Sequence, residues 1–296
     1  MTPDKTDSLE TALAALRPRL HRYCARMTGS VIDGEDVVQE AMMKAFEALP
    51  QAGTIEHLES WLVRIAHNAA LDFLRRRARR HAVLSDEDPD MLIDPTPEPV
   101  EREAAVASLR TFMELPVVQR SSVILMDVLG YSLEEISGVT GNTVLAVKAS
   151  LHRGRARLRE LAEQPDDRPP PVLGDAERGL LAAYIDRFNA RDFDTLRDML
   201  ADEVQLDLVS RLRRKGRVEV GSYFTNYSRM QGWKLMPGFV ERRPAVLVYD
   251  AGDPARTPRY FVLLEWSATR IVHIRDFYHA RYVVESAEML PSQSGG

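Results

Sequence analysis

The chain has 296 residues, enough for about two domains, and its 45% hydrophobic and 28% charged residues are typical of globular proteins. A net charge of −5 excludes a protein coated with basic charge, so any contact with nucleic acid must be local. The single cysteine, Cys24, excludes an internal disulfide framework. The first ten residues lack the basic start of a signal peptide and no apolar run reaches the length of a membrane span, so we expect a cytoplasmic protein without a membrane partner.

Two amphipathic helices are predicted before residue 50. Apolar residues recur every three or four positions over residues 8–27 and again over residues 34–49. Asp33 is the predicted N-cap of the second helix, whose first turn is acidic, as the helix dipole favours. The face of this helix away from its apolar stripe carries Asp36, Gln39, Glu40 and Met43. An acidic helix face is usually only solvated, so the pattern alone assigns no partner.

Residues 58–81 predict a longer helix with an apolar stripe and an arginine-rich end. Between positions 64 and 81 there are six arginines and one acid, Asp72. Such a run is often only a solvated face. Here, however, Trp61 precedes it, and aromatic rings stack on unpaired bases while arginines grip phosphates. The pattern therefore favours contact with a nucleic-acid strand, and the candidate residues are Trp61, Arg64, Asn68, Arg75, Arg76, Arg79 and Arg80.

This helix resembles the promoter-melting segment of the extracytoplasmic-function branch of bacterial sigma factors. That segment reads close to W-L-x-x-I-A-x-N-x-x-x-D-x-x-R-R, which residues 61–76 match. The run DGEDVVQEAMMKAF at 33–46 resembles the segment that docks on the clamp helices of RNA polymerase. The resemblance implies a region 2 domain at residues 8–82, which binds core polymerase and recognises and melts the minus-10 element. It assigns Asp36, Gln39, Glu40 and Met43 to the docking face.

An acidic linker is predicted at residues 83–103. Residues 85–103 hold eight acids, one arginine and four prolines, which leaves too little apolar surface to bury. A flexible tether explains this composition. In the resembling family, the equivalent linker threads channels of the polymerase.

Residues 104–163 are predicted to be helical and to include a helix-turn-helix. Ser132 and Glu135 form a capping box, Gly141 and Asn142 make a tight turn, and Thr143 caps a long second helix. Helical hairpins are common, so this outline alone is a weak signal. The predicted duplex-contacting residues are Thr143, Leu145, Lys148, Ala149, His152, Arg153 and Arg155.

Three motifs in this block resemble the promoter-reading region 4 of the same family: L-P-x-x-Q-R at 115–120, G-Y-S-x-E-E-I at 130–136 and V-K-x-x-L-H-R at 147–153. The resemblance implies recognition of a minus-35 element. The implied partners are the clamp and flap regions of core RNA polymerase and promoter DNA, both as duplex and as melted strand. An anti-sigma protein and a small ligand are further candidates. The family usually has serine and then arginine where this chain has Ala149 and Ser150, which leaves base readout to Lys148, His152 and smaller groups.

A proline-rich linker at 164–174 separates these two all-α domains from an α+β domain at 175–285 with a curved antiparallel sheet. Its predicted helices are 176–190 and 193–200, and its predicted strands are 204–209, 217–220, 239–249, 260–266 and 271–277. The domain resembles the polyketide-cyclase-like (SnoaL-like) cone fold. A basic run at 211–217 is either a contact surface or simply an exposed hairpin, and residues 286–296 are a predicted disordered tail.

Relatives with this cone fold are isomerases or cyclases that use an Asp or His base in the mouth of the cone. The candidate pocket residues here are Asp207, His273, Asp276 and Tyr278, with His279 beside them. Such residues are more often solvated or structurally paired than catalytic. No acid–base pair with motif spacing stands out, so we expect no catalytic residue, no metal and no cofactor, and we interpret the domain as regulatory.

Three functions remain open. The leading hypothesis is a sigma factor whose C-terminal domain modulates activity. The second is a helix-turn-helix regulator with a ligand-sensing domain, and the third is an isomerase- or cyclase-like enzyme. Residues 33–49 and 61–81 favour the first, because a regulator that reads only duplex DNA needs neither segment.

Overall fold

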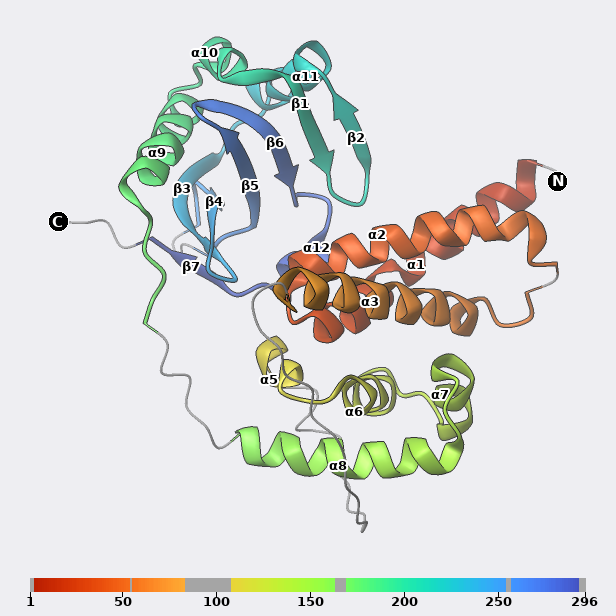
Figure 1. Cartoon of the computed structure of the whole chain (residues 1–296). Helices are drawn as coiled ribbons and strands as arrows, with labels where there is room; N and C mark the ends of the chain where they lie inside the picture. Colours follow the sequence, from red (N-terminus) through yellow and green to blue (C-terminus); the bar gives the residue numbers. More distant parts are fainter. Residues whose placement is uncertain (1–2, 54, 83–107, 163–168, 254–256, 293–296) are drawn as a thin grey trace. The chain divides into compact units, whose positions relative to one another are not determined.

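The computed structural model describes residues 3–53, 55–82, 108–162, 169–253 and 257–292 (Figure 1). The chain divides into two compact units, residues 1–167 and 168–296, and the division falls within the segment predicted as a proline-rich linker. The acidic segment 83–103 lies outside the described residues. Among the helices that are described, none is long and apolar enough to cross a membrane.

The first part of the helical unit consists of three packed helices: α1 (Pro3–Thr28), α2 (Val31–Ala48) and α3 (Leu58–Ala82). The predicted N-cap of α2 is wrong. Ser30 has extended backbone and its side chain accepts a hydrogen bond from the Asp33 amide at 3.1 Å. The helix begins three residues early because Val31 and Ile32 are buried against its neighbours.

The second part holds α5 (Leu109–Met113), α6 (Val117–Val123), a π-helical turn (Ile124–Val128), α7 (Leu133–Thr140) and α8 (Val144–Ala162). The helix-turn-helix is confirmed in detail. Ser132 and Glu135 form the capping box, and Gly141 ends α7 with a φ of 74° that favours glycine. Thr143 then caps α8 by accepting a hydrogen bond from the Ala146 amide at 3.2 Å.

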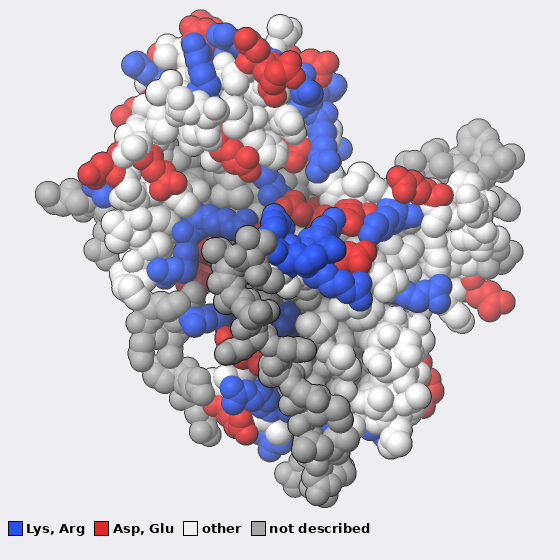
Figure 2. Space-filling model, viewed as in Figure 1, with Lys and Arg blue, Asp and Glu red and all other residues white. Residues whose placement is uncertain are grey.

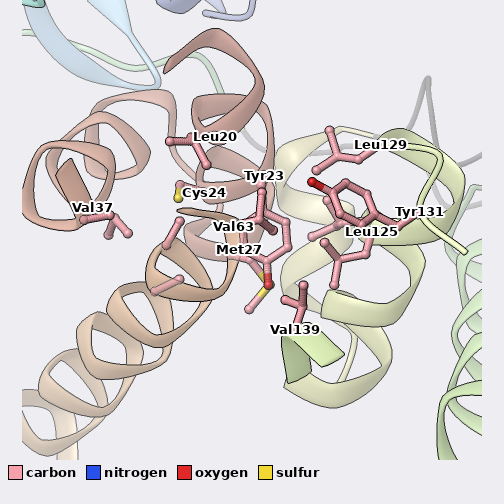
Figure 3. Packing of buried hydrophobic residues seen from close by; sticks show 14 of the residues in the cluster. Leu20, Tyr23, Cys24, Met27, Val37, Val63, Leu125, Leu129, Tyr131 and Val139 are labelled. Carbon is pink, nitrogen blue, oxygen red and sulfur yellow. The ribbon is translucent and has the colours of Figure 1, made fainter. Parts of the chain in front are cut away.

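One hydrophobic core runs through both helical parts. Leu20 and Tyr23 of α1 pack in the same cluster as Leu125, Leu129 and Val139 from the second part (Figure 3). All five side chains are less than 7% exposed. The segments predicted to melt and to read the promoter are therefore parts of one packed unit in this structure.

The second unit is a curved seven-stranded sheet with helices packed against it (Figure 1). Its helices are α9 (Asp175–Asn189), α10 (Phe193–Asp198), α11 (Arg217–Ser228) and α12 (Arg281–Val284). Its strands are β1 (Leu200–Leu208), β2 (Leu212–Lys215), β3 (Trp233–Val240), β4 (Arg243–Asp250), β5 (Tyr260–Ser267), β6 (Arg270–Asp276) and β7 (Met289–Pro291). The order is β2-β1-β6-β5-β4-β3-β7, and every pair except the parallel β1–β6 is antiparallel. The α+β prediction is confirmed, although the sheet is mixed.

Two predicted strands are wrong. Residues 217–220 begin α11. Val220, Phe224 and Tyr227 are buried at helical spacing, whereas the short run RVEV on its own alternates like a strand. The predicted strand 239–249 is a hairpin of β3 and β4. Its turn has positive φ at both Glu241 and Arg242, without the Asn-Gly pair that usually marks such turns.

The predicted disordered tail is also wrong over residues 286–292. β7 adds to the sheet edge by pairing with Gly238–Val240 of β3. Backbone pairing needs little side-chain pattern, and a strand of three residues that ends in proline is too short to show an alternating pattern.

Candidate polymerase and nucleic-acid interfaces

The solvent face of α2 presents the residues predicted to dock on polymerase. Asp36 is exposed, Gln39 is half-buried and Met43 is 50% exposed, at the three- and four-residue spacing that puts them on one side. Phe46 continues this side and is 44% exposed, although its apolar character suggested a core position. The face therefore combines an acidic start with two exposed apolar side chains.

Glu40 lies at the edge of this face and connects α2 to α3. Its carboxylate contacts Lys44 at 2.8 Å and Arg76 at 2.6 Å. Burial would raise the pKa of Glu40, but the hydrogen bonds from Lys44 and Arg76 outweigh it and lower the pKa. A predicted polymerase contact and a predicted DNA contact thus pair with each other.

α3 presents a continuous polar face that begins at an aromatic side chain. Trp61, Arg64, Asn68, Arg75 and Arg79 are separated by three, four, seven and four residues, which places them along one side of the helix. They span about 27 Å at 1.5 Å per residue. All are exposed except Trp61, which is half-buried and packs on the core.

Acidic side chains neutralise the first part of the arginine run. Arg75 contacts Asp72 at 3.0 Å and Arg77 contacts Asp33 at 3.6 Å, in addition to the Arg76–Glu40 pair. Figure 2 shows red carboxylates among the blue side chains of this region. In the described part of the chain, no acidic side chain pairs with the two last arginines, Arg79 and Arg80. The helix therefore becomes more positive toward its end.

Trp61 and Arg64 also line a cleft of 640 Å³ that they share with α7. Glu135, Gly138 and Val139 form its opposite wall. The Trp61 side chain thus lines the cleft and also packs against the hydrophobic core.

One side of the first two turns of α8 is exposed, as expected for a helix that enters a DNA groove. Thr143, Leu145 and Lys148 are exposed, with Leu145 at 78%, while Ala149 and His152 are half-buried. These residues lie on one side of α8, and Thr143 is the N-cap of this helix.

Arg155 has a structural contact that its basic character did not predict. Its Nε donates to Oδ2 of Asp127 at 2.9 Å, and the Asp127 side chain is fully buried. The predicted DNA contact is thus an ion pair that joins α8 to the π-helical turn, whereas Arg153 remains half-buried.

Arg120 of the L-P-x-x-Q-R motif is a second structural arginine that sequence analysis missed. The residue is 4% exposed, and its guanidinium donates to the carbonyl oxygens of Met27 at 2.6 Å, Met113 at 3.1 Å and Leu115 at 2.9 Å. Burial lowers the pKa of Arg120 to about 10. The Met27 contact links the two helical parts.

The C-terminal unit contains a buried cluster of one carboxylate and several tyrosines. Oδ2 of Asp276 accepts hydrogen bonds from Tyr223 Oη at 2.8 Å and Tyr227 Oη at 2.5 Å, and Oδ1 accepts one from the Tyr278 amide at 2.8 Å. Tyr260 extends the cluster through Tyr227 at 3.2 Å. Burial raises the pKa of Asp276 more than these hydrogen bonds lower it.

Asp207 and His273 lie on the opposite face of the sheet from Asp276, because successive side chains along a strand point to opposite faces and β1 pairs with β6 in the register Asp207 to Arg275. His273 Nε2 and Asp207 Oδ2 are 3.1 Å apart, and Arg213 Nε lies 2.9 Å from Asp207 Oδ1. The prediction that Asp207, His273, Asp276 and Tyr278 line one pocket is therefore wrong. The described residues also contain no cluster of His, Cys, Asp and Glu that could hold a metal.

The basic run at 211–217 is largely paired within its own unit. Besides Arg213, Lys215 contacts Glu203 at 2.9 Å and Arg217 contacts Asp198 at 2.7 Å. These pairs favour the interpretation of the run as an exposed hairpin with little free positive charge.

Comparison with known proteins matches residues 13–80 to Sigma-70 region 2 and residues 108–158 to Sigma-70 region 4. The ECF RNA polymerase sigma factor SigM of Mycobacterium tuberculosis is 36% identical over 146 residues, which cover 48% of this chain and 71% of SigM. The ECF RNA polymerase sigma factor SigG of the same organism is 26% identical over 293 residues, covering 88% of this chain and 78% of SigG. The crystal structure of the M. tuberculosis extracytoplasmic function sigma factor SigJ is 18% identical with a TM-score of 0.35, covering 90% of this chain and 95% of SigJ.

Proposed function

The chain belongs to the extracytoplasmic-function sigma factors, which direct RNA polymerase to promoters, and we propose how its surfaces divide that work. The exposed side of α2, with Asp36, Gln39 and Met43, binds the clamp of core polymerase. The polar face of α3 binds the melted strand, and the first turns of α8 bind minus-35 duplex, with the flap as a second polymerase contact.

A single observation carries this division of work. α3 places Trp61 and four polar or basic side chains along one side of a helix that is separate from the recognition helix α8. A stacking ring followed by cations suits unpaired bases on a phosphate backbone. A protein that reads only duplex DNA needs no such face, so the alternative of an ordinary helix-turn-helix regulator leaves α3 unexplained.

We assign the C-terminal unit a regulatory role without catalysis. Asp276, its best-placed carboxyl group, uses both oxygens for hydrogen bonds inside the core, while Asp207 and His273 pair on the other face. Neither arrangement leaves an acid and a base facing one substrate. A small ligand or an anti-sigma protein is a candidate effector for this unit.

Run-off transcription with purified core polymerase tests the proposal. The full chain and a version ending at Gln164 are compared at matched concentration on the same promoters. We expect both to bind core polymerase and to support promoter-dependent transcripts, with different activity. A chain that retains duplex binding yet supports no transcript would favour the regulator. Equal activity of the two versions would remove the regulatory role of the C-terminal unit.

A further inference from the structure

Among the described residues of the helical unit, the most exposed large apolar side chain lies at the start of the recognition helix. Leu145 is 78% exposed in the first turn of α8 and is absent from the hydrophobic core that includes Val147 and Leu151. Its position is fixed by the turn that precedes it, because Gly141 ends α7 and Thr143 caps α8. An isobutyl group held in water at this point contributes nothing to the packing of the unit.

The neighbours of Leu145 define what its surface can recognise. Lys148 is exposed one turn further on, and Ala149 beside it is half-buried. Ser150 is only 3% exposed, so its hydroxyl does not reach outward. The leading edge of α8 is therefore an apolar surface with one cation beside it, and no guanidinium lies within this edge.

The major groove offers one apolar group to such a surface, the C5-methyl of thymine, and lysine pairs there with O6 and N7 of guanine. Side chains three positions apart on a helix are about 5–6 Å apart at Cβ. Base pairs are about 3.4 Å apart along the duplex, so Leu145 and Lys148 reach neighbouring or next-neighbouring pairs.

We propose that Leu145 is a specificity-determining residue that reads a thymine methyl group in the minus-35 element, within two base pairs of a guanine bound by Lys148. This proposal rests on the proposed function, namely that α8 enters the major groove. It predicts a preference for thymine near guanine, which a family member with arginine at the position of Ser150 is not expected to show.

The test uses holoenzyme reconstituted from core polymerase and the full chain. A duplex pool randomised over the minus-35 region first selects the preferred sequence. Each thymine of that sequence is then replaced by deoxyuridine, which removes only the C5-methyl group. Affinities are measured for the wild type and for Leu145→Ala. Val118→Ala serves as the control, because Val118 is 47% exposed on α6, outside the recognition helix.

We expect one thymine whose replacement weakens wild-type binding by roughly threefold to tenfold. On the thymine duplex, Leu145→Ala should bind more weakly than the wild type by the same factor. Deoxyuridine replacement should not weaken the binding of Leu145→Ala further, and Val118→Ala should behave as wild type on both duplexes. Two results overturn this inference alone. Either the holoenzyme selects a sequence in which no thymine methyl group affects binding, or deoxyuridine replacement weakens the binding of Leu145→Ala as much as that of the wild type. Holoenzyme that selects no sequence, together with a Lys148→Ala variant that binds as wild type, overturns the proposed function as well.

Discussion

The hydroxyl group of Tyr131 donates a hydrogen bond to Oε1 of Glu59 at 2.8 Å, and so joins the segment before α7 to the start of α3. Arg19 completes the junction. Its Nε lies 2.6 Å from the same carboxylate, and its guanidinium lies 5.3 Å from the centre of the Tyr131 ring. The helices predicted to bind the minus-10 and the minus-35 element share one hydrophobic core, so we expect this junction to open when the protein binds a promoter.

We therefore expect Tyr131→Phe to loosen the helical unit without unfolding it. The change removes one hydrogen bond but keeps the ring beneath Arg19, so the free energy of unfolding should fall by about 1 kcal/mol. Hydrogen exchange in α7 should accelerate at the same time. Tyr278→Phe in the other unit is the control, because no described residue hydrogen-bonds its hydroxyl group. Unchanged exchange in α7 would show that the Tyr131–Glu59 hydrogen bond does not hold the parts together.

Charge reversal on α2 should weaken polymerase binding. Asp36→Arg combined with Gln39→Ala changes one exposed and one half-buried side chain and no core residue, so the fold should persist while affinity for core polymerase falls roughly tenfold or more. Glu177→Arg, an equal charge change on the exposed side of α9, should leave binding intact. Equal recovery of core polymerase in pull-downs with the α2 variant and the wild type would refute the docking face.

Alanine at Arg75 and Arg79 should separate promoter melting from duplex binding. Both side chains lie on the Trp61 face of α3, so we expect fewer open complexes and nearly unchanged minus-35 binding. Lys148→Ala combined with Arg153→Ala should do the reverse, and the slope of log affinity against log salt should become shallower by about 0.9 for a phosphate held by Arg153. Permanganate footprinting and salt titrations measure the two effects. The same defect from both sets of variants would contradict the division.

Arg155→Ala should reduce the stability of the helical unit more than its affinity for DNA. The variant leaves the fully buried Asp127 carboxylate without its ion pair, which typically costs about 3–5 kcal/mol. Lys148→Ala, on the exposed side of the same helix, should change stability by less than about 0.5 kcal/mol. Urea unfolding compares them, and Asp127→Asn placed in the Arg155→Ala background should recover part of the loss. An Arg155→Ala variant of full stability and weak DNA binding would instead support the original assignment as a DNA contact.

The long helices were predictable because their apolar residues repeat over many turns, and the capping box and Gly141 correctly predicted where α7 begins and ends. Structural roles for charged residues were not predictable in the same way. The partner of Arg155 lies 28 residues away and that of Tyr131 lies 72 residues away, so only the packed fold reveals them. The same holds for Asp276, whose tyrosine partners come from a helix that local alternation presented as a strand.

Acid should destabilise the helical unit through two buried histidines. His21 and His67 have pKa values lowered to about 4, mainly because burial disfavours the charged ring. The unfolded chain, with pKa values near 6.5, binds more protons, so stability is complete above about pH 6.5 and falls as the pH drops toward 4. Each histidine accounts for roughly 3 kcal/mol over that range.

The C-terminal unit should respond to acid with the opposite sign through Asp276. The pKa of this carboxyl group is raised by burial, so protonation favours the folded state, and its contribution falls as the pH rises through the folded pKa. Urea titrations at pH 7 and pH 5, followed by probes in each unit, separate the two trends. His67→Gln should flatten the pH dependence of the helical unit by about half, and Asp276→Asn should stabilise the other unit mainly at neutral pH. A helical unit equally stable at both pH values would mean that the histidines are not held neutral by their burial.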